Sequence, residues 1–307
     1  MQATTAPDGP AGRTDARTHG RTDGLLLVDK PAGPTSHDVV AAVRRALSER
    51  RVGHAGTLDP AATGLLVVLA GRATRLARFI TLLPKRYHGT VRFGWETTTD
   101  DAAGAPLERD ESWRALDGQQ IAAALAAVAA APLQTPPQVS AKRVGGERAY
   151  RLARRGEEPE LSPAPVAIHA LRATAYDPAA GTLEIDVECG AGTYVRAIAR
   201  DLGRGLGTRA HLAALRRVAV GPWRVEDAQP LEAIRPGALR MRPMAEAVAH
   251  LPALEVGPEA AAAVAHGRKI EAPARLEGPV AVYGSGELLA VAELREGRYA
   301  PLVVLVP

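Results

Sequence analysis

The segment RVGHAGTLDPAATGLL, residues 51–66, contains the side chains of this sequence that are best suited to chemistry. Asp59 is followed directly by Pro60 and lies between glycines just before the apolar run 64–69, an arrangement too rigidly specified for an ordinary surface turn. The structural alternative is that Asp59 caps a helix beginning at Pro60, because Asp is a favoured N-cap and Pro a favoured first helical residue. His54, taken alone, is more typical of a hydrogen-bonded loop residue than of a catalyst. The spacing H-x-G-x-L-D-P-x-A-T-G-x-L is more informative than either residue.

A second candidate site is the strongly basic segment KRVGGERAYRLARR, residues 142–155. Its cationic residues are Lys142, Arg143, Arg148, Arg151, Arg154 and Arg155, against the single acid Glu147. The net charge of the chain is only +4, from 38 basic and 34 acidic residues, so the distribution of charge is more informative than its sum. The segment is either a solvated helix face or a surface that binds a polyanion.

Length and composition limit the class of protein. A chain of 307 residues, 46% hydrophobic, can bury one large core or two unequal ones, which favours a catalytic domain with a small appendage. No run of eighteen apolar residues occurs, and residues 1–23 lack the apolar segment of a secretory signal, so we expect a cytoplasmic protein that does not enter a membrane. The single cysteine, Cys189, excludes an internal disulfide and a multi-cysteine metal site, and its neighbours predict a buried strand.

The apolar patterns that must position these residues alternate between strands and helices. We predict strands in 24–33, around Val67, in 86–97 and in 181–190, and helices over 36–48, opened by Ser36, and over 117–130. Residues 1–23 have no periodic pattern and are predicted to be a disordered tail. Gly and Pro at 250–260 mark a boundary, followed by a short helix and three strands. The sequence therefore predicts an α+β protein with a β-rich C-terminal part.

Four ordered motifs resemble the TruB family of bacterial tRNA pseudouridine synthases over residues 24 to about 234. They are GLLLVDKPAGPTSHDVV, RVGHAGTLDPAATGLLVV, KRYHGTVRFG and GAGTYVRAIARDLGRGLGTRAHLAALRR. The resemblance implies the pseudouridine synthase fold, with a mixed, mainly antiparallel sheet flanked by helices. It also implies a catalytic domain at 24–248, an RNA-gripping thumb at about 134–160, and a small RNA-binding domain of the PUA type at 249–307.

The implied reaction is isomerisation of the uridine at position 55 in the T-loop of tRNA. The uracil is cut from its sugar, turned and rejoined through carbon 5, after the uridine has been flipped out of its stack. This reaction needs neither a cofactor nor a metal, and the sequence contains no G-x-G-x-x-G motif, P-loop or metal-spaced cluster of His and Cys. The expected partner is the T-stem-loop of tRNA, with the protein acting as a monomer without an obligatory protein partner.

The resemblance also implies roles for individual residues. Asp59 would be the nucleophile, attacking either C1′ of the sugar or C6 of the base. Arg196 would pair with this aspartate through its guanidinium fork, where a surface arginine at a helix start is the alternative. Tyr87 would stack on the flipped uracil and is a candidate for removing the proton from carbon 5, where a core strand tyrosine is the alternative.

Further residues are implied in substrate binding. His54 would fill space beside the aspartate, Leu215 would line the uracil pocket unless it is only a core residue, and Tyr194 would lie behind the site. Lys30 would support the aspartate loop or, as the alternative, contact RNA. The implied thumb residues are Lys142, Arg143, Arg148, Arg151 and Arg154, although Val139 and Arg143 replace a tyrosine and a lysine of the family pattern.

Two other functions remain open from the sequence. One is the pseudouridine synthase of guide-RNA particles, which shares the aspartate motif but works with partner proteins. The long basic thumb segment favours the stand-alone bacterial form. The other is an RNA-binding folding factor with vestigial catalytic residues, and the intact Asp59, Tyr87 and Arg196 count against it.

Overall fold

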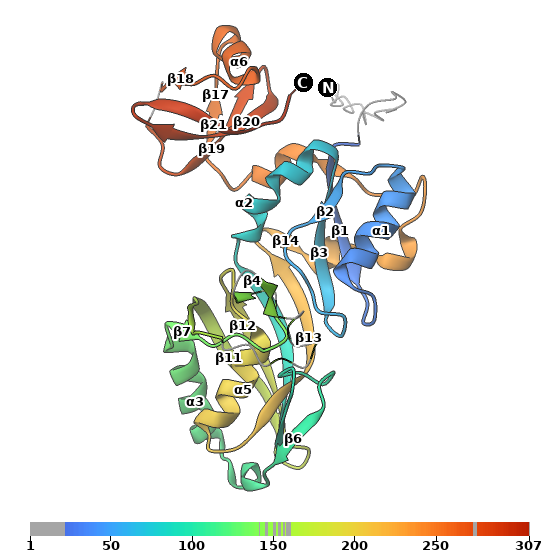
Figure 1. Ribbon diagram of the computed structural model, residues 1–307, viewed down its shortest axis with the longest axis vertical. Coiled ribbons are helices and arrows are strands. Elements are labelled where there is room, and N and C mark those ends of the chain that lie inside the picture. Colours follow the sequence, from blue (N-terminus) through green and yellow to red (C-terminus); the bar gives the residue numbers. More distant parts are fainter. Residues whose placement is uncertain are drawn as a thin grey trace, which may run out of the picture.

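The computed structural model describes residues 22–140, 142–144, 147–149, 152, 155, 157, 161–272 and 275–306. The described chain forms two main sheets, one of ten strands that carries the candidate site and one of five strands near the C-terminus (Figure 1). Arg151 and Arg154, which belong to the basic segment, lie outside the described residues. Of the predicted tail, Thr22 and Asp23 are described, and the Asp23 carboxylate accepts a hydrogen bond from the Arg72 backbone amide at 2.5 Å.

The ten-stranded sheet is mixed and mainly antiparallel, which confirms the predicted fold class. Its central order is β11 (Ile168–Asp177), β12 (Thr182–Cys189), β4 (Lys85–Phe93), β13 (Ala210–Val220), β3 (Thr63–Ala70), β1 (Gly24–Lys30) and β15 (Gln229–Pro230). The short strands β2 (Val52–His54), β14 (Trp223–Arg224) and β16 (Arg242–Pro243) pair with β3, β13 and β1. Two neighbouring pairs, β13 with β3 and β1 with β15, are parallel.

Helices cover one face of this sheet in two groups. The helix α1 (Ser36–Leu47) packs over β1 and β3, whereas α3 (Gly118–Ala130) and α5 (Val195–Gly205) pack over β4, β12 and β13 (Figure 1). Tyr87 and Leu215 pack against the hydrophobic clusters of both groups. They therefore lie where the two halves of the sheet meet.

The start of α1 differs from the expectation in a way that affects the site. The N-cap is Thr35, whose hydroxyl accepts from the Asp38 amide while the Asp38 carboxylate accepts from the Thr35 amide, forming a capping box. Ser36 is the first helical residue, and its hydroxyl accepts from the Leu58 amide at 2.9 Å and donates to the Leu58 carbonyl at 3.0 Å. Ser36 thus ties α1 to the residue that precedes Asp59.

The strand expected over residues 86–97 is divided in two. β4 ends at Phe93, and β5 (Trp95–Thr97) pairs instead with β6 (Pro106–Arg109). The break lies at Gly94, whose φ of +110° is outside the range of a strand. The hairpin that β5 begins carries residues 98–101 toward α5, where they contact its arginines.

Several other expectations are confirmed. In β12 the side chains of Leu183, Ile185, Val187 and Cys189 are all buried, as their alternation predicts. Burial raises the pKa of the Cys189 thiol to about 11, in keeping with a core residue. The helix α3 begins after Asp117, which forms a capping box with Gln120.

Two short antiparallel strand pairs occur in the region of the basic segment. β7 (Leu133–Gln134) pairs with β10 (Ala164–Pro165) on either side of that segment, and β8 (Arg143–Val144) pairs with β9 (Glu147–Arg148) within it.

Short helices of the 3-10 type occur at Gly71–Leu76, Ser112–Ala115, Val225–Asp227, Leu231–Ala233 and Met244–Val248, and α2 (Ala77–Thr81) follows the first of them.

The C-terminal sheet is joined to the large sheet through a shared hydrophobic cluster that also contains residues of α2 and of the 3-10 helices at 71–76 and 244–248. Its order is β17 (Ala253–Glu255), β19 (Pro279–Gly284), β20 (Glu287–Arg295), β21 (Arg298–Val304) and β18 (Ile270–Glu271), with the helix α6 (Pro258–Ala265) beside it. Val291 and Val303 share one hydrophobic cluster with Leu25 and Val67 of the large sheet. Arg72 adds a hydrogen bond of 2.6 Å to the Leu305 carbonyl. The C-terminal part is therefore anchored to the catalytic sheet.

Gly64 is required by both backbone conformation and packing, which gives a test of the fold. Its φ is +101°, and a Cβ atom there would stand 2.2 Å from the Arg217 carbonyl oxygen. We expect Gly64→Ala to lower the free energy of unfolding by about 1–2 kcal/mol for the left-handed conformation and by about 1–3 kcal/mol more for the overlap. Denaturant unfolding of Gly64→Ala measures the sum of these two losses of free energy.

The matched control is Gly33→Ala. Gly33 has a similar φ of +104°, but a Cβ there would meet nothing within 4 Å. It should therefore show only the conformational loss. Equal losses in the two variants would contradict the close approach of β3 to β13.

Candidate active site

Asp59 lies in the connection between β2 and β3. The chain makes a turn at Pro60 and Ala61, the Asp59 carbonyl accepts from the Ala62 amide at 3.1 Å, and β3 begins at Thr63. No helix follows Asp59, so the interpretation of this residue as a helix cap is wrong. Its carboxylate is 41% exposed, which leaves it accessible to a substrate while one side is held by the protein.

Lys30 supports this turn through hydrogen bonds to backbone carbonyls. Its side chain is fully buried, and its ammonium donates to the carbonyl oxygens of Pro31 and Pro34, both at 2.9 Å, and of Pro60 at 3.1 Å. Burial lowers the pKa of Lys30, and the nearby Asp59 carboxylate partly opposes that effect. Since all three donors of the ammonium are used, these contacts favour structural support over direct contact with RNA.

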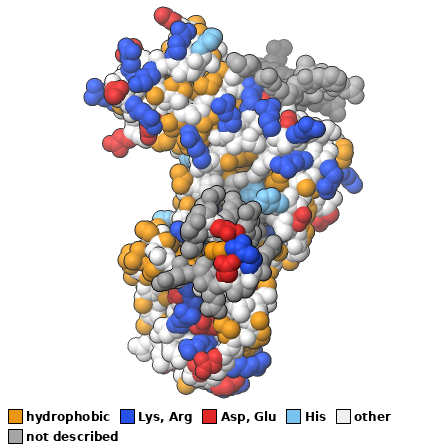
Figure 2. Space-filling model, viewed as in Figure 1, with side chains coloured by type: hydrophobic (Ala, Val, Ile, Leu, Met, Phe, Trp, Pro, Cys, Tyr) orange, Lys and Arg blue, Asp and Glu red, His pale blue; other side chains and the backbone are white. Residues whose placement is uncertain are grey.

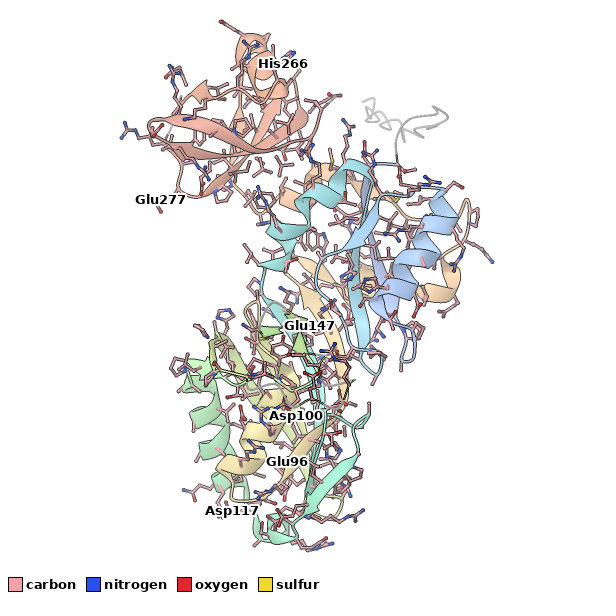
Figure 3. All side chains as sticks on the ribbon, in the orientation of Figure 1. Glu96, Asp100, Asp117, Glu147, His266 and Glu277 are labelled. Carbon is pink, nitrogen blue, oxygen red and sulfur yellow. The ribbon has the colours of Figure 1, made fainter. Side chains whose placement is uncertain are left out.

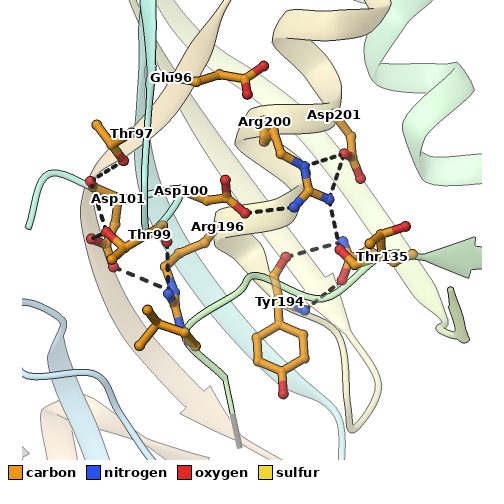
Figure 4. Close-up of polar contacts among 12 residues, drawn as sticks. Glu96, Thr97, Thr99, Asp100, Asp101, Thr135, Tyr194, Arg196, Arg200 and Asp201 are labelled. Carbon is orange, nitrogen blue, oxygen red and sulfur yellow. Dashed lines mark hydrogen bonds and ion pairs between the residues drawn. The ribbon is translucent and has the colours of Figure 1, made fainter. Parts of the chain in front are cut away.

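Arg196, near the start of α5, contacts Asp59 directly. Its Nε lies 3.0 Å from Asp59 Oδ2 and 3.6 Å from Asp101 Oδ2. Its terminal nitrogens donate to two backbone carbonyls, Nη1 to Thr99 at 2.8 Å and Nη2 to Val139 at 3.1 Å (Figure 4). The expected fork on the carboxylate is therefore absent. The guanidinium meets Asp59 through Nε and uses its other donors to fix its own orientation.

Tyr87 projects from β4 at the junction of the two halves of the sheet. It is half-buried and packs against both hydrophobic clusters there. Burial raises the pKa of its phenol, and the neighbouring Arg217 guanidinium opposes that shift. In the free protein at neutral pH the phenol is therefore protonated, which suits it to stacking and hydrogen bonding more than to proton removal.

Two buried cations that the sequence reasoning missed lie beside Tyr87. Arg217, only 1% exposed, donates to the carbonyls of Leu65 at 2.7 Å, Gly56 at 3.0 Å and Thr57 at 3.3 Å. It therefore holds the segment that leads to Asp59. The sequence carried no signal for this, because the pairing of Arg217 with Tyr87 across β13 and β4 exists only in the folded sheet.

Lys85 is the second of these cations. Its side chain is buried, and its ammonium donates to the carbonyls of Thr81 and of Leu83, the latter at 2.7 Å. Burial and the Arg217 charge lower the pKa of Lys85 to about 8. Lys85 shares the inward face of β4 with Tyr87 and Gly89, so strict alternation along this strand could have identified it as a buried lysine.

The remaining candidates surround this centre. His54 ends β2, its ring meets the His37 ring edge-on with centroids 5.7 Å apart, and burial lowers its pKa, so the ring is neutral at pH 7. Leu215 is half-buried between the two clusters. The backbone of Tyr194 caps α5 and is bonded through both its amide and its carbonyl to the Gln134 side chain.

The basic segment is described only in part. Lys142 is exposed, and Arg143 and Arg148 are register partners in the β8–β9 pair. Arg155 forms ion pairs with Glu147 and Glu157, both at 2.7 Å. The expected RNA contacts of Arg143 and Arg148, and those of Arg151 and Arg154, stay predictions.

Two features are absent from the described residues. No group of three or more His, Cys, Asp or Glu side chains there is arranged to hold a metal ion. No described helix is both long and apolar enough to cross a membrane.

Comparison with known proteins agrees with this arrangement. A model of the N-terminal domain of the TruB family pseudouridylate synthases matches residues 44–195, and a model of the tRNA pseudouridylate synthase B C-terminal domain matches residues 196–248. The tRNA pseudouridine synthase B of Thermobifida fusca (strain YX) is 47% identical over 290 residues, covering 92% of this chain and 98% of that protein. The chain belongs to the TruB family. It is accordingly an isomerase of the tRNA pseudouridine synthase class.

Further relatives extend the comparison. The tRNA pseudouridine synthase B of Streptomyces griseus is 43% identical over 92% of this chain and 97% of that protein. A model described as the C-terminal domain of tRNA pseudouridine synthase II matches residues 251–306, in accord with a PUA-like domain for the C-terminal sheet.

Solved structures share the fold at low identity. An H/ACA ribonucleoprotein bound to a substrate RNA containing 2′-deoxyuridine has a chain with a TM-score of 0.69 and 22% identity, covering 93% of this chain and 86% of that one. A Cbf5-Nop10-Gar1 complex gives a TM-score of 0.69 and 24% identity over the same shares. These likenesses confirm the pseudouridine synthase fold.

The buried ammonium of Lys85 gives a testable pH dependence. Its pKa in the folded protein, about 8, lies below the ordinary lysine value of 10.5, so the unfolded chain binds more protons between these two values. The free energy of unfolding should therefore rise with pH across this window, by up to about 3 kcal/mol from this group. Urea unfolding at pH 7.5 to 10.5, with about half-unit steps, measures the slope.

Tyrosines also titrate near the upper end of this pH range. The slope of the free energy of unfolding against pH is therefore compared between the wild-type protein and Lys85→Met. Met has similar length and no charge, and the variant should lack the Lys85 contribution while retaining those of the tyrosines. The same slope in both proteins would contradict a depressed Lys85 pKa.

Proposed function

We propose that this TruB-family enzyme converts the uridine at position 55 in the T-loop of tRNA to pseudouridine, with Asp59 as the nucleophile. The observation that supports this most strongly is the environment of Asp59. Its carboxylate is partly exposed, lies on a turn anchored by Lys30 and Ser36, and is held at 3.0 Å by a guanidinium that is itself 7% exposed. A nucleophile needs this combination of access and orientation.

The chemistry is an isomerisation in which atoms balance without a further reactant. The bond between N1 of uracil and C1′ of the sugar breaks, the ring turns, and a bond between C5 and C1′ forms. The proton on C5 leaves, and N1 gains one. Asp59 attacks C1′ or C6, and both routes use the same carboxylate.

The role of Arg196 follows from its contacts. Its Nε directs one carboxylate oxygen of Asp59, Oδ2, and leaves the other oxygen free for attack. The two carbonyl contacts, to Thr99 and Val139, prevent rotation of the guanidinium plane. Orientation of a reacting group in this manner contributes to rate without changing the affinity for the substrate.

The uridine must leave its stack to reach Asp59. Flipping costs a few kcal/mol, which contacts to phosphates and aromatic rings offset. We assign stacking on the flipped uracil to Tyr87, the edge of the pocket to Leu215, and the adjoining wall to His54. Lys and Arg side chains are numerous on the visible face of the C-terminal domain and beside it, where they would contact phosphates (Figure 2).

We propose that the enzyme works as a monomer without an obligatory protein partner. The curated relatives at 42–47% identity are named tRNA pseudouridine synthase B, whereas the matched chains of the H/ACA ribonucleoprotein and of the Cbf5-Nop10-Gar1 complex share only 22% and 24% identity. An RNA-binding factor without catalysis would not need an arginine buried against an exposed carboxylate. A cytoplasmic location is part of this proposal.

The first test of the nucleophile is Asp59→Asn. The amide is nearly isosteric but has no anionic oxygen to form a covalent adduct, so pseudouridine formation should fall below detection. Binding of tRNA should persist, because its affinity comes from many contacts spread over the thumb, the C-terminal domain and Tyr87. Both are measured on one preparation with an unmodified tRNA transcript and no additions.

Thermal unfolding of Asp59→Asn serves as the control for folding. A folded, tRNA-binding and inactive variant supports the nucleophile. Substantial activity in a folded variant would refute the assignment and the mechanism built on it. Mapping the pseudouridine in wild-type product separately tests position 55.

The second test is Tyr87→Phe, which retains the ring and removes the hydroxyl. If the hydroxyl removes the proton from C5, the single-turnover rate should fall by about 100-fold or more, the usual contribution of a general base. The raised pKa of this phenol favours stacking as its main role, and then the loss is about twofold. Tyr87→Leu, which also removes the ring, should be strongly impaired in either case, and an active Leu variant would exclude Tyr87 from the site.

A further inference from the structure

Three arginines of α5 lie one turn apart on the same face and bind acidic residues of the 96–101 segment. Arg204 forms a bidentate pair with Glu96 at 2.8 and 2.7 Å, Arg200 Nη1 bonds Asp100 Oδ2 at 2.7 Å, and Arg196 Nε lies 3.6 Å from Asp101. Glu96 and Asp100 both lie beside α5 (Figure 3). Of these three arginines, Arg196 is the one that also contacts Asp59.

Asp100 has the least ordinary conformation in this series. It is a buried residue with a φ of +61°, in the left-handed region that non-glycine residues rarely adopt. Such conformations cost of order 1 kcal/mol or more and persist where surrounding contacts determine them. Here its amide donates to the Thr97 carbonyl at 3.2 Å and its carbonyl accepts from the Leu212 amide at 3.0 Å.

The carboxylate of Asp100 is what fixes this turn to α5. Burial raises the pKa of Asp100, and the Arg200 and Arg196 charges oppose that shift. The side chains of Arg200 and Asp100 are only 7% and 11% exposed, so their pair is screened little by water. The residues on either side of Asp100 supply the Thr99 carbonyl and the Asp101 carboxylate that contact Arg196.

Arg200 also binds the other segment that reaches Arg196. Its Nη2 donates to the Thr135 carbonyl at 2.7 Å, at the base of the thumb, and its Nε donates to Asp201 at 2.9 Å (Figure 4). Four residues further along the thumb, the Val139 carbonyl accepts from Arg196. The Arg200 guanidinium therefore anchors both segments that hold the Arg196 guanidinium.

We infer that Asp100 and Arg200 form a positioning pair that holds the turn at residues 99–101 and the thumb base so that Arg196 points at Asp59. This inference rests on the proposed role of Asp59. Among the described residues, the hydrogen bonds of Arg200 go to Asp100, Thr135 and Asp201, so the pair acts on Arg196 and not directly on the reacting atoms. Their effect is transmitted through the two backbone carbonyls and the Asp101 carboxylate that orient Arg196.

The test uses Asp100→Gly and Arg200→Met in the full-length enzyme. Glycine tolerates a φ of +61° but removes the carboxylate, so the loss of the ion pair is separated from backbone strain. The single-turnover rate at saturating enzyme should fall by about tenfold or more, because a small misplacement of an orienting group costs one to two orders of magnitude. The Kd for tRNA should change by less than about twofold, since phosphate and stacking contacts are retained.

Glu96→Gln is the matched control. It weakens the pair with Arg204, on the same helix face and from the same segment. Among the described residues this pair forms no hydrogen bond to Thr99, Asp101 or Val139, although its charges act on Asp100. A comparable fall in Tm is expected, with the rate unchanged. If Asp100→Gly and Glu96→Gln had equal effects on rate, the pair would be merely structural and the inference would be overturned.

A second readout does not depend on activity. The Nε–H resonance of Arg196, assigned by its loss in Arg196→Lys, should shift in Asp100→Gly and in Arg200→Met and stay in place in Glu96→Gln. An unchanged resonance in folded Asp100→Gly would overturn the inference. If Arg200→Met does not fold, Asp100→Asn, which keeps the αL tolerance and the side-chain size, replaces it. Activity of Asp59→Asn would instead refute the proposed nucleophile, so the two failures are distinguishable.

Discussion

The burial of the Arg196 guanidinium is the constraint on which the active site depends. A cation removed from water is tolerated only when its donors are bonded and its charge is compensated. Arg196 meets this requirement with Asp59, Asp101 and the carbonyls of Thr99 and Val139, which come from three segments far apart in the sequence. The same contacts that make its burial possible bring the aspartate loop, the β5–β6 hairpin and the thumb base together. The contacts that satisfy the donors and the charge of Arg196 are therefore the same contacts that assemble the site.

The other buried cations near the loop that carries Asp59 are stabilised in a different way. Lys30, Lys85 and Arg217 are buried, and the contacts described above for all three are to backbone carbonyls. Carbonyl oxygens satisfy the donors without adding a second negative group beside Asp59. The contacts of Lys30 reach residues 31–34 and Pro60, those of Arg217 reach residues 56–57, and those of Lys85 reach the end of α2 at residues 81–83. The loop is thus held by cations that are bonded to the backbone, and the Asp59 carboxylate pairs with Arg196.

Patterns in the sequence predicted those parts of the fold that are determined by residues close together in the chain. Alternation identified the inward face of β12, the capping sequence identified α3, and the motif around Asp59 identified its loop. The sequence could not show that Thr35 rather than Ser36 caps α1, because Ser36 is used by Leu58, which is near only in the folded chain. It also could not show that Arg196 would meet Asp59 through Nε, since the carbonyls that take its other nitrogens belong to loops whose conformation is set by tertiary contacts. The buried partners of Lys85 and Arg217 were missed for the same reason.

The geometry explains why an arginine is needed at position 196. A lysine ammonium is a compact charge with three donors at one point, whereas the acceptors around Arg196 are spread over three segments and face different edges of a plane. A lysine reaching Asp59 would leave the Thr99 and Val139 carbonyls without their donor, and an unpaired buried carbonyl costs about 1–3 kcal/mol. It would also be free to rotate, so the direction of the Asp59 carboxylate would no longer be fixed. The planar guanidinium converts contacts made by the segment at residues 135–139 and by the turn at Asp100 into a defined orientation of one oxygen atom, which the proposed role of Asp59 as a nucleophile requires.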